Sequence, residues 1–308
     1  MTTLLVSHQA CLDHNPGTYH PERPERLKAV LTGLAEDEFR ALERVTAPRA
    51  EDRHLMLAHP AAFVEAVLGC IPPAGRHALD GDTVVSPGSG ESALRAAGAV
   101  VAAIDAVVAG KAKNAFCAVR PPGHHAEAAT AMGFCLFNNV AIGALHARTA
   151  HGLDRVAVID FDVHHGNGTQ HMFERDRSLF YASTHQWPLY PGTGAADERG
   201  VGNIVNAPLR SHSGGREFRD AFERKILPAL DAFAPDLIII SAGFDAHQDD
   251  PLASLMLVED DYAWVTSALA EVARTHAKGR IVSALEGGYD LHALASSAAA
   301  HVRALMAA

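Results

Sequence analysis

The sequence contains little cysteine and no apolar run of the length that a membrane-spanning helix needs. Its cysteines show no closely paired spacing, which argues against a disulfide framework and predicts free thiols at Cys11, Cys70, Cys117 and Cys135. The amino terminus also lacks the charged and apolar regions of a signal peptide. We therefore expect a cytoplasmic protein that does not act at a membrane.

Positive charge is also scarce in the chain. The 26 Lys and Arg residues are outnumbered by 36 Asp and Glu residues, the net charge is −10, and no basic stripe is present. Such a charge disfavours nonspecific binding to nucleic acid, so we expect no nucleic-acid partner. It suits cationic substrates such as lysine-rich tails or polyamines, although it is also an ordinary charge for solubility.

Hydrophobic residues make up 48% of the 308 residues, enough to bury a large core. Apolar runs predict strands, and longer segments between them predict helices. This alternation predicts an α/β fold with a mainly parallel central sheet covered by helices on both faces. No linker-like stretch interrupts the pattern, so a single domain is expected over residues 1–308. The strands are expected near residues 3–7, 115–119, 155–160, 179–184, 236–241 and 280–285, and helices near 90–110, 216–233, 259–277 and 293–308.

The most informative stretch is Asp160 to Gly168, with the sequence Asp-Phe-Asp-Val-His-His-Gly-Asn-Gly. It directly follows the apolar run Val156 to Ile159, which is typical of a buried strand. Alternation along the strand would place Asp162 and His164 on one side at its carboxyl end, where open α/β sheets bind their ligands. A carboxylate and an imidazole suit zinc, which requires a third protein ligand and an open position in a catalytic site.

Asp245 is the candidate for the third metal ligand. It follows the second strongly apolar run, Leu237 to Ile240, in a local context much like that of Asp162. A single carboxylate after a strand is more often a helix cap or a turn residue than a metal ligand. Two such carboxylates beside a histidine favour a metal site.

Two further segments carry polar side chains after apolar runs. His124 and His125 lie in a loop forced by neighbouring prolines and glycine, with a glycine-rich turn at residues 131–134 shortly after it. A histidine with a near-neutral pKa can accept a proton from metal-bound water. Tyr289 follows two glycines and could donate a hydrogen bond to an oxyanion. Taken alone, the histidines could be surface residues and the tyrosine could simply pack over a turn.

The order of these motifs resembles the zinc-dependent histone deacetylase family. The matching segments are Arg-Pro-Pro-Gly-His-His-Ala from Arg120, Gly-Phe-Cys-Leu-Phe-Asn-Asn from Gly133, the Asp160 stretch, Ser-Ala-Gly-Phe-Asp from Ser241, and Glu-Gly-Gly-Tyr from Glu286. With His-Pro-Glu-Arg-Pro-Glu-Arg-Leu at residues 20–27, they are most similar to the class II and bacterial histone deacetylase-like amidohydrolase branch, which includes acetylpolyamine amidohydrolases. The resemblance extends from about residue 8 to 290 and implies the arginase/deacetylase-like form of the α/β fold.

The resemblance also implies roles for the residues of the site. It implies one zinc ion per chain, with iron(II) as the other metal to consider, bound by Asp162, His164 and Asp245. It makes His124 and His125 the catalytic histidines, Asp160 and Asn167 their partners, and Tyr289 the residue that polarises the carbonyl. The class I branch has an aspartate where this chain has Asn167, so His125 is expected to have a neutral partner and to be charged less readily.

The walls of a narrow acyl tunnel are implied at Gly133, Phe134 and Tyr190, where Tyr190 replaces the usual phenylalanine. Leu252 stands at the rim, seven residues after the third implied zinc ligand. A polyamine-selective branch has a glutamate there, whereas leucine resembles the lysine deacetylases. Asp249 and Asp250 nevertheless place carboxylates nearby in the sequence. A structural potassium ion is implied at residues that match Asp160, Asp162, His164, Ser183 and Thr184.

The implied reaction is hydrolysis of an acylamine. Zinc would lower the pKa of its bound water from 15.7 toward about 7, so that a neutral histidine suffices as the general base. The implied partner is an acetylated lysine in a protein or peptide, with an acetylated polyamine as the alternative, and a homo-oligomer remains open. An arginase-type binuclear manganese hydrolase would need more carboxylates in the strand-end motifs. A noncatalytic acyl-lysine binding protein would not need every ligand, both histidines and the tyrosine.

Overall fold

The computed structural model describes residues 2–308, so Met1, the first residue of the predicted domain, lies outside the described residues. Its centre is an eight-stranded sheet with the order β2-β1-β5-β10-β9-β6-β7-β8, in which every pair of neighbouring strands is parallel. The strands of this sheet are β1 (Thr3–Ser7), β2 (Glu43–Thr46), β5 (Asn114–Cys117), β6 (Val156–Asp160), β7 (Leu179–Gln186), β8 (Ile204–Leu209), β9 (Leu237–Ala242) and β10 (Ile281–Leu285). Two short strands, β3 (His77–Ala78) and β4 (Val84–Val85), form a separate antiparallel pair. The predicted α/β class with a parallel sheet is confirmed.

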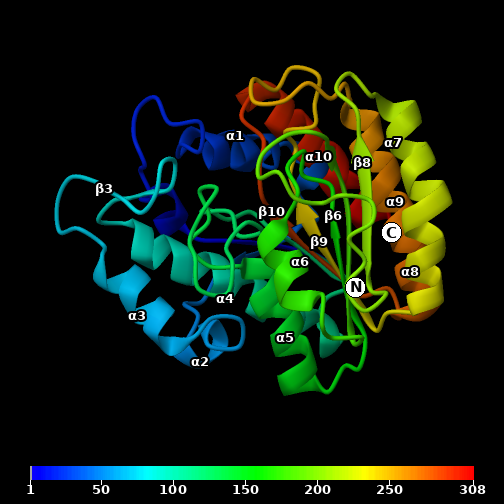
Figure 1. Ribbon diagram of the computed structural model, residues 1–308, viewed down its shortest axis with the longest axis horizontal. Helices are drawn as coiled ribbons and strands as arrows, with labels where there is room; N and C mark the ends of the chain where they lie inside the picture. The colour runs from blue at the N-terminus through cyan, green and yellow to red at the C-terminus, as the bar shows by residue number, and fades with distance from the viewer. Residues whose placement is uncertain (1) are drawn as a thin grey trace.

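Helices cover both faces of this sheet (Figure 1). On one face α4 (Ser89–Val108) and α5 (Asn139–His151) pack together, and on the other α1 (Glu25–Gly33), α9 (Glu259–His276) and α10 (Leu291–Ala307) pack together. The remaining helices are α2 (Asp52–Leu55), α3 (Ala61–Gly69), α6 (Asn167–Phe173), α7 (Gly215–Ala221) and α8 (Leu227–Phe233), with the short helical turns η1 (Gln9–Leu12), η2 (Asp37–Phe39) and η3 (Phe222–Ile226).

The central strands are apolar because helices exclude water from both of their faces. Every residue of β6, β9 and β10 is buried, and most of these residues are Val, Ile, Leu or Ala. The same burial explains why the sequence predicts these strands to within one or two residues. The helix expected over 216–233 is instead α7, a π-helical turn and α8 in continuous succession. Two strands toward the ends of the sheet, β2 and β8, were not predicted.

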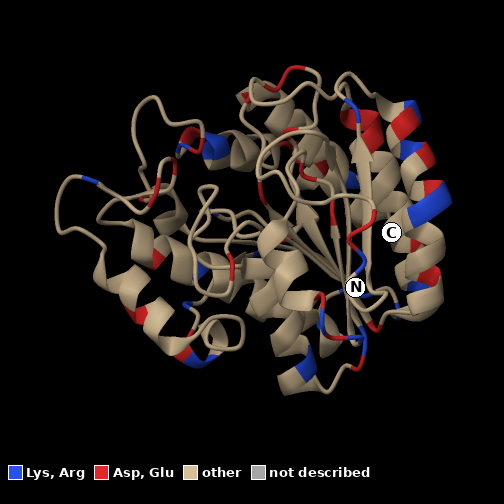
Figure 2. Ribbon diagram, viewed as in Figure 1, with Lys and Arg blue, Asp and Glu red and all other residues tan. Residues whose placement is uncertain are grey.

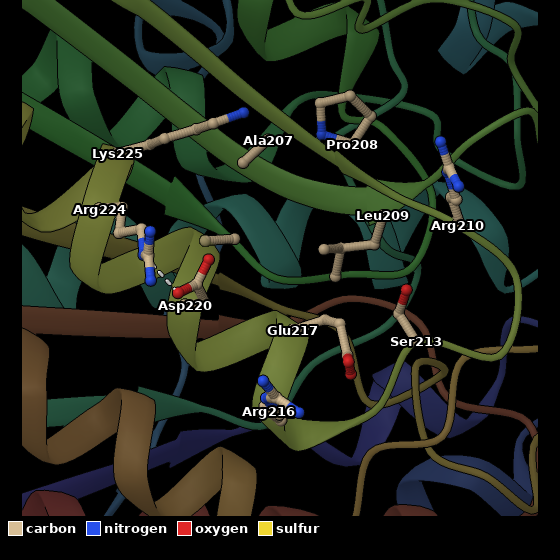
Figure 3. Close-up of a pocket in the computed structure, with 11 residues that line it drawn as sticks. Ala207, Pro208, Leu209, Arg210, Ser213, Arg216, Glu217, Asp220, Arg224 and Lys225 are labelled. Carbon is tan, nitrogen blue, oxygen red and sulfur yellow. Dashed lines mark ion pairs between the residues drawn. The ribbon is translucent and has the colours of Figure 1, made fainter.

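Charged residues lie mainly on the outer elements (Figure 2). Acidic and basic side chains are interspersed on α7 and η3, and few charged side chains lie on the central strands. A hollow of about 580 Å³ lies between β8 and this helical run, and it carries both signs of charge, including an ion pair between Asp220 and Arg224 (Figure 3). Among residues 2–308, no helix has both the length and the apolar character needed to cross a membrane.

The sheet order places the sequence motifs side by side. The four consecutive strands β5, β10, β9 and β6 are followed at their carboxyl ends by the loops that carry His124, Tyr289, Asp245 and Asp162 respectively. Because parallel strands all end at the same edge, four segments far apart in the sequence meet at one place.

Candidate active site

Asp162, His164 and Asp245 form a compact cluster at this edge of the sheet. His164 Nδ1 lies 3.1 Å from Asp162 Oδ1 and 3.1 Å from Asp245 Oδ2. One potential ligand atom from each residue lies within 4.8 Å of those of the other two. Both aspartates are buried, whereas the His164 side chain is 11% exposed and faces the cavity described below. One imidazole and two carboxylates match the donor set of a zinc site with an open position.

Backbone amides hold the two carboxylates in place. Val163 N–H donates to Asp245 Oδ1 over 2.8 Å, and Gly287 N–H donates to Asp162 Oδ2 over 2.8 Å. A Cβ atom at position 287 would collide with both carboxylates, so only glycine allows the backbone to come this close. Burial and the charge of Asp162 raise the pKa of Asp245 to about 6. Two carboxylates held this close in a buried site favour a bound cation.

His124 is paired with a carboxylate. Its Nδ1 lies 3.0 Å from Asp160 Oδ2, and the same oxygen accepts a hydrogen bond from the Tyr181 hydroxyl. Burial alone would lower the pKa of His124, but the charges of Asp162 and Asp160 outweigh it and raise that pKa to about 10. The protonated form of His124 is therefore favoured in the protein without a bound cation.

His125 has a different partner. Its Nδ1 donates to Asn167 Oδ1 over 2.8 Å, and burial, together with the charges of His124 and His164, holds the pKa of His125 well below its usual value. The neutral partner expected from the sequence is thus in place. Asn167 Nδ2 in turn donates to Glu127 Oε1, so a carboxylate stands one residue further along this hydrogen-bond chain.

Glu286 positions the loop that carries the histidines. Its Oε2 accepts hydrogen bonds from the backbone of Gly123 over 2.6 Å and of His124 over 3.2 Å, and its Oε1 accepts one from the Ser241 hydroxyl. Glu286 belongs to the Glu-Gly-Gly-Tyr motif, which by itself indicates no role for this residue. Its burial after an apolar strand is the signal that could have identified a structural carboxylate.

Tyr289 is held at its backbone and its ring. Its N–H donates to Asp250 Oδ2 over 2.7 Å, the Arg26 guanidinium lies 4.8 Å from the ring centroid, and the ring meets that of Phe134 edge to face at 6.0 Å. Within residues 2–308 the hydroxyl donates to no protein group and the residue lines the cavity, so the hydroxyl is available to a ligand. Asp250 also accepts from the backbone of Leu252, so its buried carboxylate points inward and not to the rim.

A cavity of about 240 Å³ leads to the cluster. It brings together the four residues predicted to bind substrate with one histidine of the tandem pair, one residue of the metal cluster and the tyrosine. Two lining residues, Asp82 and Leu189, were not predicted to line it, although Leu189 is next to the predicted Tyr190 in the sequence. The lining consists of Asp82, His125, Gly133, Phe134, His164, Leu189, Tyr190, Leu252 and Tyr289.

The walls of this cavity are aromatic and its mouth is open. Gly133 and Phe134 both have positive φ values, 57° and 68°, and a Cβ atom at position 133 would lie 2.5 Å from His125 Cδ2. Tyr190 packs its ring edge-on to that of His125 at 5.1 Å and is 39% exposed. Leu252 is 36% exposed, as expected for a residue at the rim. The shape suits a slender acyl chain that enters from the surface.

The residues matched to a potassium site lie close to the metal cluster. Ser183 is paired in register with Asp160 across β6 and β7, and its hydroxyl bonds to His185 Nδ1. The buried Thr184 hydroxyl has no hydrogen-bond partner in the described part of the chain. An oxygen donor that is buried and unpaired fits a cation ligand.

Comparison with known proteins identifies the family. The histone deacetylase domain matches residues 20–305. The chain belongs to the histone deacetylase family. It is 42% identical over 277 residues to the histone deacetylase-like amidohydrolase of Pseudomonas aeruginosa, a match that covers 88% of this chain and 72% of that protein. It is 39% identical over 324 residues to the chloroplastic histone deacetylase 14 of Arabidopsis thaliana, covering 98% and 76%.

Solved structures agree with this assignment. The crystal structure of the HDA15 HD domain superposes with a TM-score of 0.93 at 36% identity, over 99% of this chain and 88% of that one. The resemblance seen in the sequence and the arginase/deacetylase form of the fold are therefore confirmed. Membership of this family makes the chain a hydrolytic enzyme of the deacetylase and amidohydrolase class.

Proposed function

We propose that this deacetylase-family protein is a zinc-dependent amidohydrolase that removes acetyl groups from the side-chain amine of acyl-lysine or a related acylamine. One observation supports this most strongly. A metal-ligand cluster, a histidine held neutral and a tyrosine with a free hydroxyl all face one cavity of about 240 Å³. Residues 1–308 would form one catalytic domain, since β1 near the start of the chain and β10 near its end both pair with β5 in one sheet.

Asp162, His164 and Asp245 would bind zinc or iron(II). When bound, such an ion supplies a Lewis acid that polarises the amide carbonyl and acidifies water. The potassium site at Asp160, Asp162, His164, Ser183 and Thr184 is part of the same proposal, supported by the unpaired Thr184 hydroxyl. Potassium there would offset the carboxylate charge beneath the site.

The proton transfers follow from the two histidine environments. His125 lines the cavity and is held neutral, so it accepts the proton as water attacks the carbonyl carbon. The resulting imidazolium then donates that proton to the leaving amine nitrogen, with its Nδ1–H still bonded to Asn167. His124 does not line the cavity, and as an imidazolium paired with Asp160 it would stabilise the negative charge of the transition state.

Tyr289 would donate a hydrogen bond to the oxyanion that forms from the carbonyl oxygen. Asp250 holds the backbone of Tyr289 and the Arg26 guanidinium lies over its ring before the substrate arrives, so little reorganisation is needed. Gly133, Phe134 and Tyr190 would enclose the acyl-bearing methylene chain and exclude water from it.

The mouth of the cavity favours an acyl-lysine side chain over a polyamine. Leu252 offers a neutral, apolar rim where a second ammonium group of a polyamine would need a carboxylate. The half-buried Asp82 on the lining is the one observation that favours the alternative, an acetylpolyamine amidohydrolase. A noncatalytic acyl-lysine binding protein is less well supported, since it would not need a free tyrosine hydroxyl beside a proton acceptor.

The experiment is a comparison of kcat/KM for acetyl-lysine peptides and acetylated polyamines with the zinc-loaded protein. We expect acetate release from both classes and a higher kcat/KM for the peptides. A higher value for the polyamines would select the alternative. If His125→Ala still releases acetate at the wild-type rate, the proposed proton transfers are wrong. The metal content of this variant, measured in parallel, shows whether the metal site is intact.

A further inference from the structure

A second cluster of metal-binding side chains lies away from the active site. Asp105 near the end of α4 faces His146 and His151 in the second half of α5. His146 Nε2 lies 2.7 Å and His151 Nε2 lies 2.6 Å from the same oxygen, Asp105 Oδ1. Within residues 2–308, only this cluster and the active-site cluster bring three such ligand atoms within 4.8 Å of one another.

A third histidine lies beside this cluster. The His54 ring of α2 stands edge-on to that of His146 with 5.3 Å between the centroids, and both line a hollow of about 430 Å³ together with Asp105. Because His54 Nδ1 accepts a hydrogen bond from the backbone of Glu51, its neutral ring carries the proton on Nε2. His54 therefore borders the cluster without being one of its ligands.

The nearest fixed positive charge does not compete for the cluster. Arg53 also lines the hollow, but its guanidinium is paired with Glu51 over 2.9 Å. The other lining residues, Leu57, Thr149 and Ala150, carry no charge. Asp105 is therefore the only carboxylate on this lining, and its direct partners are His146 and His151.

The cluster lies at the opposite end of the sheet from the catalytic residues. α5 begins at Asn139, whose side chain bonds to the backbone of Pro121 in the histidine loop, and its 13 residues lead away from that loop over about 20 Å. α4 also begins on the side of the active site and ends near Asp105. α2 packs against α5, which brings His54 to the same place (Figure 1).

We propose that Asp105, His146 and His151 form a second binding site for a divalent transition metal such as Zn²⁺, with the fourth position left to water. Imidazole nitrogens with one carboxylate oxygen are the ligands that zinc, nickel and copper prefer. In a tetrahedral zinc site with bonds of about 2.0–2.2 Å, neighbouring ligand atoms are about 3.3 Å apart. The two Nε2–Oδ1 distances would therefore open by less than about 1 Å as the ion replaces the hydrogen-bonding protons.

Such an ion would join α4 to α5 through metal bonds in place of the two hydrogen bonds that Asp105 makes to His146 and His151. No group of the active site touches it, so its effect would be on stability and not on the chemical step. Zinc bound to the folded protein alone raises the unfolding temperature.

The experiment counts zinc ions bound per chain, by elemental analysis and by titration of the metal-free protein against a chromophoric chelator. We expect two ions for the wild type, one for Asp105→Asn, one for His151→Ala, and two for the control His276→Ala. The control removes a histidine that is paired with Asp231 over 2.7 Å but belongs to neither cluster. Circular dichroism and thermal unfolding show whether each variant is folded.

This inference is independent of the proposed function, and one further variant separates the two. Asp245→Ala should keep one zinc ion, and that ion should raise its unfolding temperature, whereas Asp245→Ala with Asp105→Asn should keep none and show no shift. Equal zinc counts in the wild type, Asp105→Asn and His151→Ala would overturn the second site. So would the absence of bound zinc in a folded Asp245→Ala variant.

Discussion

Replacing Tyr289 by phenylalanine removes one hydroxyl and little else. The backbone bond to Asp250, the position of the ring beneath Arg26 and its contact with Phe134 do not involve the oxygen. The hydroxyl makes no hydrogen bond to the protein in the described residues, so none is lost on mutation. If it donates to the oxyanion, its removal costs about 2.7–4 kcal/mol in the transition state, or about 10²–10³ in kcat.

The assay compares acetyl-lysine and trifluoroacetyl-lysine versions of one peptide. The trifluoroacetyl group is already electrophilic and depends less on an oxyanion donor, so the deficit of Tyr289→Phe should shrink markedly on it. Tyr262→Phe is the matched control, because the buried Tyr262 hydroxyl has no hydrogen-bond partner among residues 2–308 and its ring packs against that of Phe244. That variant should keep kcat on both substrates, and both variants should keep their zinc content.

Equal deficits of Tyr289→Phe on the two substrates would refute this reasoning. They would mean that the hydroxyl acts in binding or packing and not on the developing charge. If Tyr289→Phe loses zinc, the change in its activity reports on the metal site and not on the hydroxyl.

Three further predictions concern other parts of the molecule. Gly133→Ala should lower the free energy of unfolding by about 1–2 kcal/mol, because residue 133 has a positive φ. The kcat of this variant should also fall, because the new Cβ atom would displace the His125 ring. An unchanged urea-unfolding curve and an unchanged kcat would contradict this prediction. The pKa of the buried His301 is lowered to about 3 by desolvation, so the folded protein binds fewer protons than the unfolded chain between about pH 6.5 and 3, and stability falls as the pH drops through that range. His301→Gln should therefore flatten the fall in urea-unfolding free energy from pH 6 to pH 4 by up to about 1.4 kcal/mol per pH unit, and an unchanged slope would show that other groups dominate. Leu252→Glu adds a carboxylate at the rim, which would attract an ammonium group about 4 Å away by about 1 kcal/mol. The kcat/KM for an acetylpolyamine, divided by that for acetyl-lysine, should therefore rise about fivefold. An unchanged ratio would place polyamine recognition elsewhere.

The strands next to the site could be predicted from sequence because they are buried on both faces. An uninterrupted run such as Leu237 to Ile240 has few structural interpretations other than a central strand. Asp162 and His164 were expected together from strand alternation; they lie just beyond the end of β6, and both nevertheless turn into the same cluster. The edge strand β2 is short and mostly polar, and the edge strand β8 contains Asn206 and Pro208, so neither has the uninterrupted apolar run of a central strand and both escaped prediction.

Residues outside the motifs could not be placed in the same way. Asp250 follows the third predicted ligand by five residues, but only the structure shows that its carboxylate turns inward to bond to Tyr289 and not outward to the rim. Glu127 reaches Asn167 through a side-chain contact across 40 residues, for which the sequence has no periodic signal. Asp82 comes from a loop whose path depends on tertiary packing.

Zinc titration of the metal-free Asp105→Asn variant, with acetate release from an acetyl-lysine peptide as the readout, tests the proposed function most directly. This variant lacks the second proposed metal site, so the count refers to Asp162, His164 and Asp245 alone. The proposal predicts no acetate release without metal, a linear rise with added zinc and a plateau at one ion per chain, and no recovery when Asp245→Ala is added. Acetate release that is independent of zinc, or a fully zinc-loaded protein that releases no acetate from any acylamine, would contradict it.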